Sequence, residues 1–289
     1  MTWYKSVDQL PSIMDYDIIK GKRTYQYFDG DVLYPFGHGL SYTHFDYRQL
    51  KLSCDKANQN DRIQIEFTVE NSGTFDGDEV VQLYVKANHS RVKRPLKTLK
   101  NFKRLSIKSG ESAQVKFELP ASELAFWDVV SESYKVETGT YTIMVGTSSA
   151  NLPLQTTIDI IGDELEQRTF KNKVKAFNYD DYHNVYVDEG ENREYCIRTN
   201  DQNGWIGFYQ NDLSYPFSQW KVRVYSEAAA EIQLRVGSVD GDIIASIVID
   251  GTHQWQQLQT DVKEAISENC VDLYVVLRGD IQLSWLQLL

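Results

Sequence analysis

The sequence predicts an all-β protein with two β-sandwich domains preceded by an extended N-terminal arm. Two observations predict this fold. Apolar and polar residues alternate in short runs from about residue 46 onward, as in strands with one buried face. Clusters of Asn, Asp, Ser and Gly separate these runs at the spacing of a β-sandwich. A charged stretch interrupts the alternation, and we interpret 161–172 as a linker between the domains.

Length and composition restrict the class of protein. A chain of 289 residues corresponds to about two domains, and its hydrophobic content of 42% can supply two cores. The formal net charge of −11 argues against general affinity for nucleic acid. No apolar run is long enough to span a membrane. We therefore expect neither nucleic acid nor membrane as a partner.

Cysteine usage and the first residues bear on the compartment. Cys54, Cys196 and Cys270 are widely spaced and odd in number, which fits neither a metal pattern nor a disulfide framework. The first six residues contain no hydrophobic signal core. Both observations favour a cytoplasmic location.

Residues 1–45 do not read as an independent domain. Trp3-Tyr4 and Tyr25-Gln26-Tyr27-Phe28 are aromatic islands among polar residues, without a periodic apolar run. We expect this segment to lie along the next domain as an arm. Within it, Pro35 fixes its own φ, and Gly37 and Gly39 permit backbone angles that other residues avoid. Large apolar residues flank them, so this run should turn sharply and pack against another element.

The segment 46–160 predicts an immunoglobulin-like β-sandwich. Its alternating runs are Ile63/Ile65/Phe67/Val69, Val81/Leu83/Val85, Val115/Phe117/Leu119 and Tyr141/Ile143/Val145. The segment 173–289 predicts a second sandwich, of jelly-roll type. Its runs are Trp220/Val222/Val224, Ile232/Leu234/Val236, Ile247/Ile249, Val271/Leu273/Val275/Leu277 and Ile281/Leu283/Trp285. Trp220 and Trp285 lie on these apolar faces and should be core residues.

Several acidic motifs could indicate a catalytic or a metal-binding site. Asp-Gly-Asp occurs at 29–31, 76–78 and 240–242, but none has EF-hand spacing, and Asp-Gly favours tight turns. Glycoside hydrolysis needs two facing carboxyl groups, and nothing in the sequence marks such a pair. Asp180-Asp181 and the acids at 188 and 191 read as solvated loop charges. The five His are scattered, so we expect no catalytic residue in this chain.

Several motifs, in order, carry a family resemblance. They are Leu33–Thr43, Phe75–Val85, Arg94–Arg104, Ser109–Ser112, Leu124–Asp128 and Gly139–Gly146. This half of the chain resembles the end of the α/β sandwich domain and the fibronectin type III-like domain of family 3 glycoside hydrolases. In that family the nucleophilic Asp and the acid/base Glu come from domains that precede this region.

The resemblance implies that the chain is the C-terminal accessory region of a β-xylosidase or β-glucosidase. Its partners would be the upstream catalytic domains, and alone it should be inactive. Asp15-Tyr16 and Gly21–Phe28 favour the β-xylosidase type.

The last domain resembles family 6 carbohydrate-binding modules. The motifs are Gly204–Phe208, Val239–Ile244, Trp255–Thr260 and Asp272–Gly279. In that family a sugar lies between aromatic faces, beside an Asn near the C-terminus. Trp255 falls at one aromatic position, Tyr195 and Trp205 are both candidates for the other, and Gln282 stands at the Asn position. The ligand implied is an oligosaccharide or polysaccharide.

Departures from the family pattern leave alternatives open. The family's calcium ligands are an early Glu and a late Asp, and Phe177 and Ser284 occupy those places. This argues against calcium, and we expect no cofactor. Gln282 is one methylene longer than the Asn of the family, so its amide group takes a different position. The rival hypothesis is a purely structural or oligomerisation module without sugar binding. An open aromatic cleft around Trp255 favours binding, and a filled cleft favours a bracing role.

Overall fold

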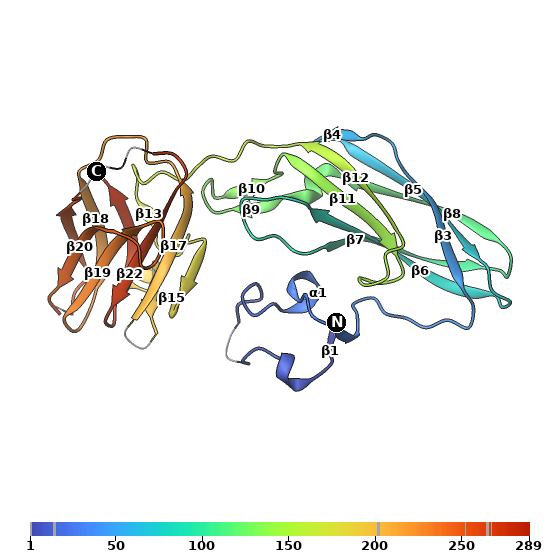
Figure 1. The fold of residues 1–289 in the computed structure, drawn as a ribbon, viewed down its shortest axis with the longest axis horizontal. Helices are drawn as coiled ribbons and strands as arrows, with labels where there is room; N and C mark the ends of the chain where they lie inside the picture. Colours follow the sequence, from blue (N-terminus) through green and yellow to red (C-terminus); the bar gives the residue numbers. More distant parts are fainter. Residues whose placement is uncertain (1, 14–15, 201–202, 252, 264–265, 267) are drawn as a thin grey trace. The chain divides into compact units, whose positions relative to one another are not determined.

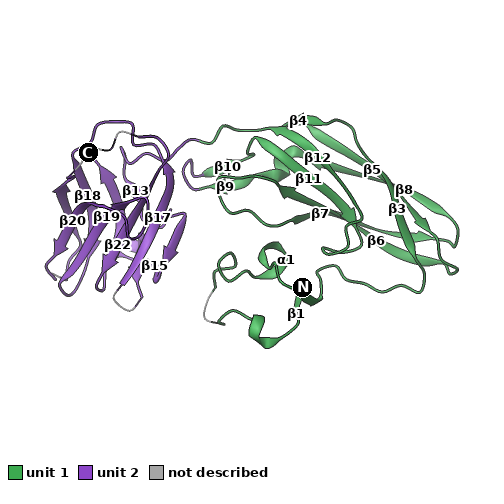
Figure 2. Ribbon diagram, in the orientation of Figure 1, with its two compact units in different colours: residues 1–128, 133–165 green, residues 129–132, 166–289 purple. Residues whose placement is uncertain are grey.

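The computed structural model describes residues 2–13, 16–200, 203–251, 253–263, 266 and 268–289. It confirms the predicted all-β fold class (Figure 1). Asp15, which contributed to the β-xylosidase resemblance, lies outside the described residues. The chain divides into two compact units, Met1–Asp128 with Ser133–Leu165, and Val129–Glu132 with Glu166–Leu289 (Figure 2). No helix in the described ranges is long and apolar enough to cross a membrane.

The first unit contains a sandwich of a three-stranded and a five-stranded sheet. The three-stranded sheet has the order β3 (Phe45–Leu52), β5 (Arg62–Asn71) and β8 (Ser112–Pro120). The five-stranded sheet has the order β4 (Lys56–Asn58), β12 (Leu154–Ile161), β11 (Gly139–Gly146), β6 (Gly77–Ala87) and β7 (Thr98–Ile107). A short 3-10 turn at Ala121–Leu124 leads to a hairpin of β9 (Phe126–Asp128) and β10 (Ser133–Lys135).

The apolar residues of the predicted alternating runs form the core of this sandwich. Ile63, Ile65, Phe67 and Val69 on β5 are buried, and the predicted apolar residues of β6, β8 and β11 meet them in one cluster. Burying such a side chain contributes about 1.5–3 kcal/mol. The hydrophobic effect therefore fixes the register of both sheets, because a one-residue slip would turn these side chains to solvent.

The arm carries more local structure than an extended chain. β1 (Trp3–Tyr4) pairs with β2 (Val32–Tyr34), a 3-10 turn covers Val7–Gln9, and α1 spans Thr24–Tyr27. Tyr4 packs edge-on against Phe28, with ring centroids 4.7 Å apart. The arm thus closes on itself as a loop before it reaches β3 (Figure 1).

The second unit is a sandwich of two antiparallel sheets. One has the order β15 (Val185–Glu189), β16 (Tyr195–Thr199), β23 (Gln282–Leu288), β18 (Gln219–Tyr225) and β21 (Gln256–Asp261), with β13 (Val174–Lys175) beside β23. The other has the order β14 (Asp181–His183), β17 (Asn203–Asn211), β22 (Val271–Arg278), β19 (Ala230–Val236) and β20 (Ile243–Ile249). A 3-10 turn covers Glu191–Arg193. From β16 to β19 and from β20 to β23 the chain alternates between sheets, as in a jelly roll.

Most predicted core residues of the second sandwich are buried, and Val236 is partly buried at the end of its strand. Trp220 is fully buried in the core cluster, as predicted. Trp285 is also buried but does not belong to that cluster: its register partner is Arg223, and Lys173 Nζ lies 4.4 Å from its ring centroid. The prediction that Trp285 lies on the core face is therefore wrong, because a bulge in the pairing of β18 with β23 shifts the alternation. The third Asp-Gly-Asp motif forms the turn between β19 and β20, as predicted. The other two lie in the arm and at the start of β6.

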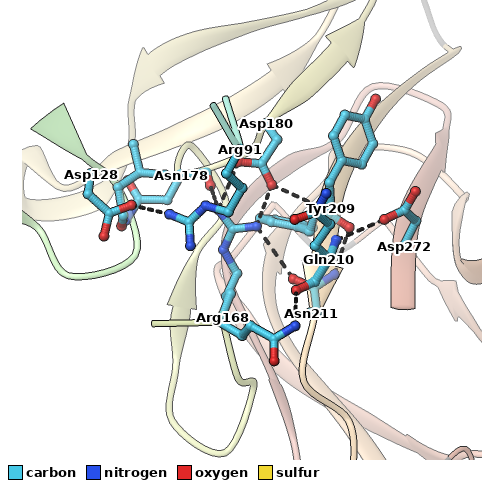
Figure 3. Close-up of polar contacts among 12 residues, drawn as sticks. Arg91, Asp128, Arg168, Asn178, Asp180, Tyr209, Gln210, Asn211 and Asp272 are labelled. Atoms are coloured by element: carbon cyan, nitrogen blue, oxygen red, sulfur yellow. Dashed lines mark hydrogen bonds and ion pairs between the residues drawn. The ribbon is translucent and has the colours of Figure 1, made fainter. Parts of the chain in front are cut away.

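Arg168 and Asp180 form a buried ion pair in the second unit (Figure 3). The Arg168 side chain is 4% exposed, and its Nη1 donates to Asp180 Oδ2 at 2.6 Å. Its Nη2 donates to the Asn178 carbonyl at 3.0 Å, and its guanidinium lies over the Phe208 ring. Asp180 also accepts the Tyr209 backbone N–H at 2.8 Å. The interpretation of Asp180 as a solvated loop charge is therefore wrong, because a cation within the predicted linker pairs with it.

Replacing Arg168 by Met should unfold the second sandwich more easily. The substitution leaves the Asp180 carboxylate partly buried without its cation, which typically costs about 3–5 kcal/mol. Urea unfolding followed by tryptophan fluorescence would measure the loss in free energy of unfolding. Arg193→Met is the matched control, because the Arg193 side chain is 93% exposed. A loss below about 1 kcal/mol for Arg168→Met would contradict a stabilising role for the pair.

Candidate functional site

The turn at Pro35–Gly39 is held by the buried carboxamide of Gln82 on β6. Gln82 Nε2 donates to the Gly37 carbonyl at 3.2 Å and to the Thr147 carbonyl at 2.5 Å. The Tyr84 hydroxyl donates to Gln82 Oε1 at 2.6 Å. Gly37 has φ of +80°, and a Cβ there would lie 2.2 Å from Gln82 Oε1. A side chain at this position would therefore displace the carboxamide.

Aromatic packing and backbone hydrogen bonds extend this attachment of the arm. Tyr25 stacks on Phe36 with ring centroids 4.4 Å apart, and its hydroxyl accepts the Leu99 N–H at 3.0 Å. The Ser149 N–H donates to the Phe36 carbonyl at 2.9 Å. The Leu96 N–H donates to a carbonyl of α1 at 2.7 Å. Two segments of the arm are thus fixed to the outer side of the five-stranded sheet.

The same arm leaves many large apolar side chains in solvent. Leu40 is 92% exposed and Tyr42 is 98% exposed. The exposed large hydrophobic residues of the arm are Trp3, Val7, Leu10, Ile13, Tyr16, Ile18, Leu33, Tyr34, Leu40 and Tyr42. Such a concentration in one short segment is typical of an interaction surface.

In the second sandwich, Trp255 and Gln282 meet at Tyr225. Four neighbouring strands each contribute one residue at the same register position. These residues are Tyr186 on β15, Arg198 on β16, Gln282 on β23 and Tyr225 on β18. The Trp255 ring centroid lies 5.9 Å from that of Tyr225. These five residues form a transverse series, here called the outer row, on the face opposite the core. Four strand spacings give it a length of about 19 Å.

Arg223 covers part of the Trp255 ring. Its guanidinium carbon lies 4.9 Å from the ring centroid. Glu191 and Glu194 hold the guanidinium, with N–O distances of 2.7 and 2.6 Å. The 3-10 turn after β15 therefore supplies two carboxylates that place a cation over the indole. Trp255 is half-buried as a result, and Arg223 occupies part of the ring face that a ligand would contact.

Cys196 lies beneath the outer row. It shares the outward side of β16 with Arg198, but its side chain is fully buried. Burial raises the pKa of the Cys196 thiol to about 11, so the thiol is protonated at neutral pH. Its single S–H faces two acceptors, the Asp188 carbonyl at 3.6 Å and Gln282 Oε1 at 3.8 Å. The second contact engages the carboxamide oxygen, and among the described residues the Gln282 amide nitrogen has no hydrogen-bond partner.

The other two candidates lie away from Trp255. Trp205 is on β17 in the opposite sheet, where it packs between His183 and Tyr274. Tyr195 begins β16 on the same side of the strand as buried Ile197, and its ring meets Phe177 edge-on. The fold therefore brings Trp255 and Gln282 together but places neither Trp205 nor Tyr195 in the outer row.

The two positions that correspond to calcium ligands in the resemblance do not supply the oxygens that a calcium ion needs. Phe177 offers no oxygen ligand, and Ser284 is buried on β23, where its carbonyl accepts the Ala176 N–H at 2.8 Å. Calcium requires several oxygen ligands. Within the described ranges, no group of three His, Cys, Asp or Glu side chains is arranged to hold a metal.

Comparison with known proteins defines the class of the first unit. Residues 79–149 match the family of fibronectin type III-like domains. The sheet composition described above agrees with this assignment, and the chain is therefore an all-β protein that carries a fibronectin type III-like domain.

The relatives are β-xylosidases and β-glucosidases. The xylan 1,4-beta-xylosidase of Xylanibacter ruminicola is 41% identical over 155 residues, which cover 54% of this chain and 17% of the enzyme. The thermostable beta-glucosidase B of Acetivibrio thermocellus is 36% identical, over 47% of this chain and 18% of the enzyme. The GH3 beta-glucosidase of Bifidobacterium adolescentis aligns with a TM-score of 0.52 and 31% identity, over 59% of this chain and 27% of that structure. This chain thus spans less than a third of the enzymes it matches.

Sequence reasoning missed three members of the outer row, Tyr186, Arg198 and Tyr225. One signal was present for Tyr225. The alternation of Trp220, Val222 and Val224 assigns the intervening residues and Tyr225 to the outer face. The pairing of β16 with β23 joins residues more than eighty positions apart, and no local pattern encodes it.

Gly37→Ala should detach the arm without unfolding the sandwich. The substitution requires a left-handed conformation that costs about 1–2 kcal/mol for a residue with a Cβ, and it displaces the Gln82 carboxamide. We expect faster proteolysis and hydrogen exchange within residues 2–40, with little change in the melting temperature.

Gly39→Ala is the matched control for this prediction. No atom lies within 4 Å of a Cβ at Gly39. Equal protection of the arm in the two variants would show that the contact between Gly37 and Gln82 does not hold it.

Proposed function

We propose that this chain is the C-terminal accessory region of a family 3 glycoside hydrolase acting on β-xylosides or β-glucosides. The catalytic residues would be supplied by the rest of the parent enzyme. The observation that carries this proposal is the arm, which is fixed to the fibronectin type III-like domain on one side and exposes ten large apolar residues among its described positions. The named relatives, which extend well beyond the matched region, support it.

The exposed arm residues suit a large apolar partner surface. Burial of a Leu or aromatic side chain contributes about 1.5–3 kcal/mol. An isolated domain gains nothing from leaving Leu40 and Tyr42 in water, whereas a covering domain would bury both. The arm would then act as the connection between the catalytic body and the accessory domain. The second sandwich would follow as a further module.

A chimera tests the docking role of the arm. Residues 1–165 of this chain would replace the matched region of the Xylanibacter ruminicola β-xylosidase. We expect the chimera to hydrolyse a chromogenic β-xyloside. The double change Leu40→Ser and Tyr42→Ser should lower its melting temperature and its activity, because about 3 kcal/mol or more of apolar burial is lost.

Two controls accompany the chimera. Phe102→Ser changes a residue that is also largely exposed but lies on β7 and not on the arm, and it should have little effect. The 289-residue chain alone should be inactive. Hydrolysis by this chain alone would refute the assignment of catalysis to the parent, and equal stability of all chimeras would refute docking through the arm.

A second candidate function is carbohydrate binding by the second sandwich. The outer row presents two adjacent aromatic rings beside polar side chains. Pyranose rings pack their C–H faces on aromatic surfaces, while a few polar groups fix orientation. In the outer row, the Tyr225 and Trp255 rings would contact the sugar. The Gln282 amide, on the strand beside Tyr225, would donate a hydrogen bond to it. We infer that an oligosaccharide would lie across the strands here.

Titration with xylo- and gluco-oligosaccharides tests this site. Trp255→Ala and Tyr225→Ala should each weaken binding by about tenfold, since the loss of one ring that a pyranose covers is expected to cost about 1.4 kcal/mol of binding free energy. Trp205→Ala is the matched control, because Trp205 lies on the opposite sheet. Equal affinity in all variants, or no binding by the unmodified chain, would favour the structural alternative. In that case the Arg223 guanidinium over the Trp255 ring belongs to a domain that stabilises the parent enzyme without binding sugar.

A further inference from the structure

A pocket lies between the arm and the five-stranded sheet of the first unit. It encloses about 490 Å³, within the range of small-molecule sites. The arm contributes Tyr25, Phe28 and Phe36 to its wall. The sheet contributes Lys86 from β6 and Thr142 from β11, and Lys97 immediately precedes β7. All its lining residues belong to the first unit.

The polar residues of this pocket include two lysines. Lys86 and Lys97 both line it, and Lys97 Nζ donates to the Ser149 carbonyl at 2.6 Å. Burial and the neighbouring Lys86 ammonium lower the pKa of Lys97. In the described part of the chain, neither lysine forms an ion pair with a carboxylate. The carboxylate of the lining, Asp29, is held by Lys22 at 2.8 Å.

The rest of the wall is largely aromatic, because the arm supplies the rings of Tyr25, Phe28 and Phe36. The pocket therefore combines two lysine side chains with aromatic walls.

We propose that this pocket binds a small carboxylate carried on a six-membered ring. The lysine ammoniums would receive the carboxylate through charge-assisted hydrogen bonds. Tyr25, Phe28 and Phe36 would contact the ring. Tyr25 is held in place by its stacking on Phe36 and its contact with Leu99, so this wall is preformed. An aromatic acid and a sugar acid share this chemistry.

Calorimetric titration of the full chain tests the proposal with two acids and their neutral counterparts. Benzoate and glucuronate are the ligands, and benzyl alcohol and glucose are the controls. We expect saturable binding of at least one acid and no binding of its neutral counterpart. The acid that binds more tightly shows whether the pocket prefers an aromatic acid or a sugar acid. Added salt should weaken the binding, because it screens the attraction between ammonium and carboxylate.

Lysine variants show whether the acid occupies this pocket. Lys86→Met and Lys97→Met should each weaken binding about tenfold or more, because each removes a charged hydrogen bond. Lys103→Met, at an exposed position outside the pocket, is the matched control. Lys86 is exposed, so its variant should fold even if Lys97→Met does not. The proposal is overturned if neither acid binds, if neutral ligands bind equally, or if Lys86→Met leaves affinity unchanged.

Discussion

The carboxamide of Gln82 is the contact on which the placement of the arm depends. A buried side-chain amide must use both its donors and its acceptor, because an unmet polar group in a low-dielectric site costs about 1–3 kcal/mol. Gln82 meets this requirement with the carbonyls of Gly37 and Thr147 and the hydroxyl of Tyr84. The arm is therefore a component of the sheet's outer layer, and its turn cannot shift without leaving the amide unpaired. The stacking of Tyr25 on Phe36 follows from this fixed turn.

Fixing the arm at a few points explains both sites in the first unit. The arm meets the sheet through the Pro35–Gly39 turn and through α1, and it spans the space between these contacts without filling it. That space is the lysine-lined pocket. Other arm residues, among them Leu40 and Tyr42, remain exposed to solvent. One set of anchors thus creates a partly open, lysine-lined pocket and an exposed apolar surface in the same segment.

The sequence predicted the strands but not the long-range contacts that make the sites. Alternation at Ile63–Val69 or Trp220–Val224 is a local pattern, and burial of one face enforces it, so these predictions are confirmed. Arg168 was read as part of a charged linker, because its partner Asp180 is specified by the fold and not by spacing. The outer row likewise depends on which strands become neighbours. Gly37 was recognisable as a turn residue, but its clash with Gln82 needed the tertiary structure.

Charge balance would distinguish the ligands of the two proposed sites. In the outer row, Glu191 and Glu194 neutralise Arg223, and Asp280 holds Arg198 at 2.9 Å. An anionic ligand there would have to displace these carboxylates, whereas a neutral sugar would add hydrogen bonds to groups already compensated. In the pocket, neither lysine forms an ion pair with a carboxylate among the described residues, and the Lys86 charge disfavours the charged form of Lys97. An anion relieves this repulsion and a neutral ligand does not. The two sites should therefore select opposite ligand classes even though aromatic rings line both.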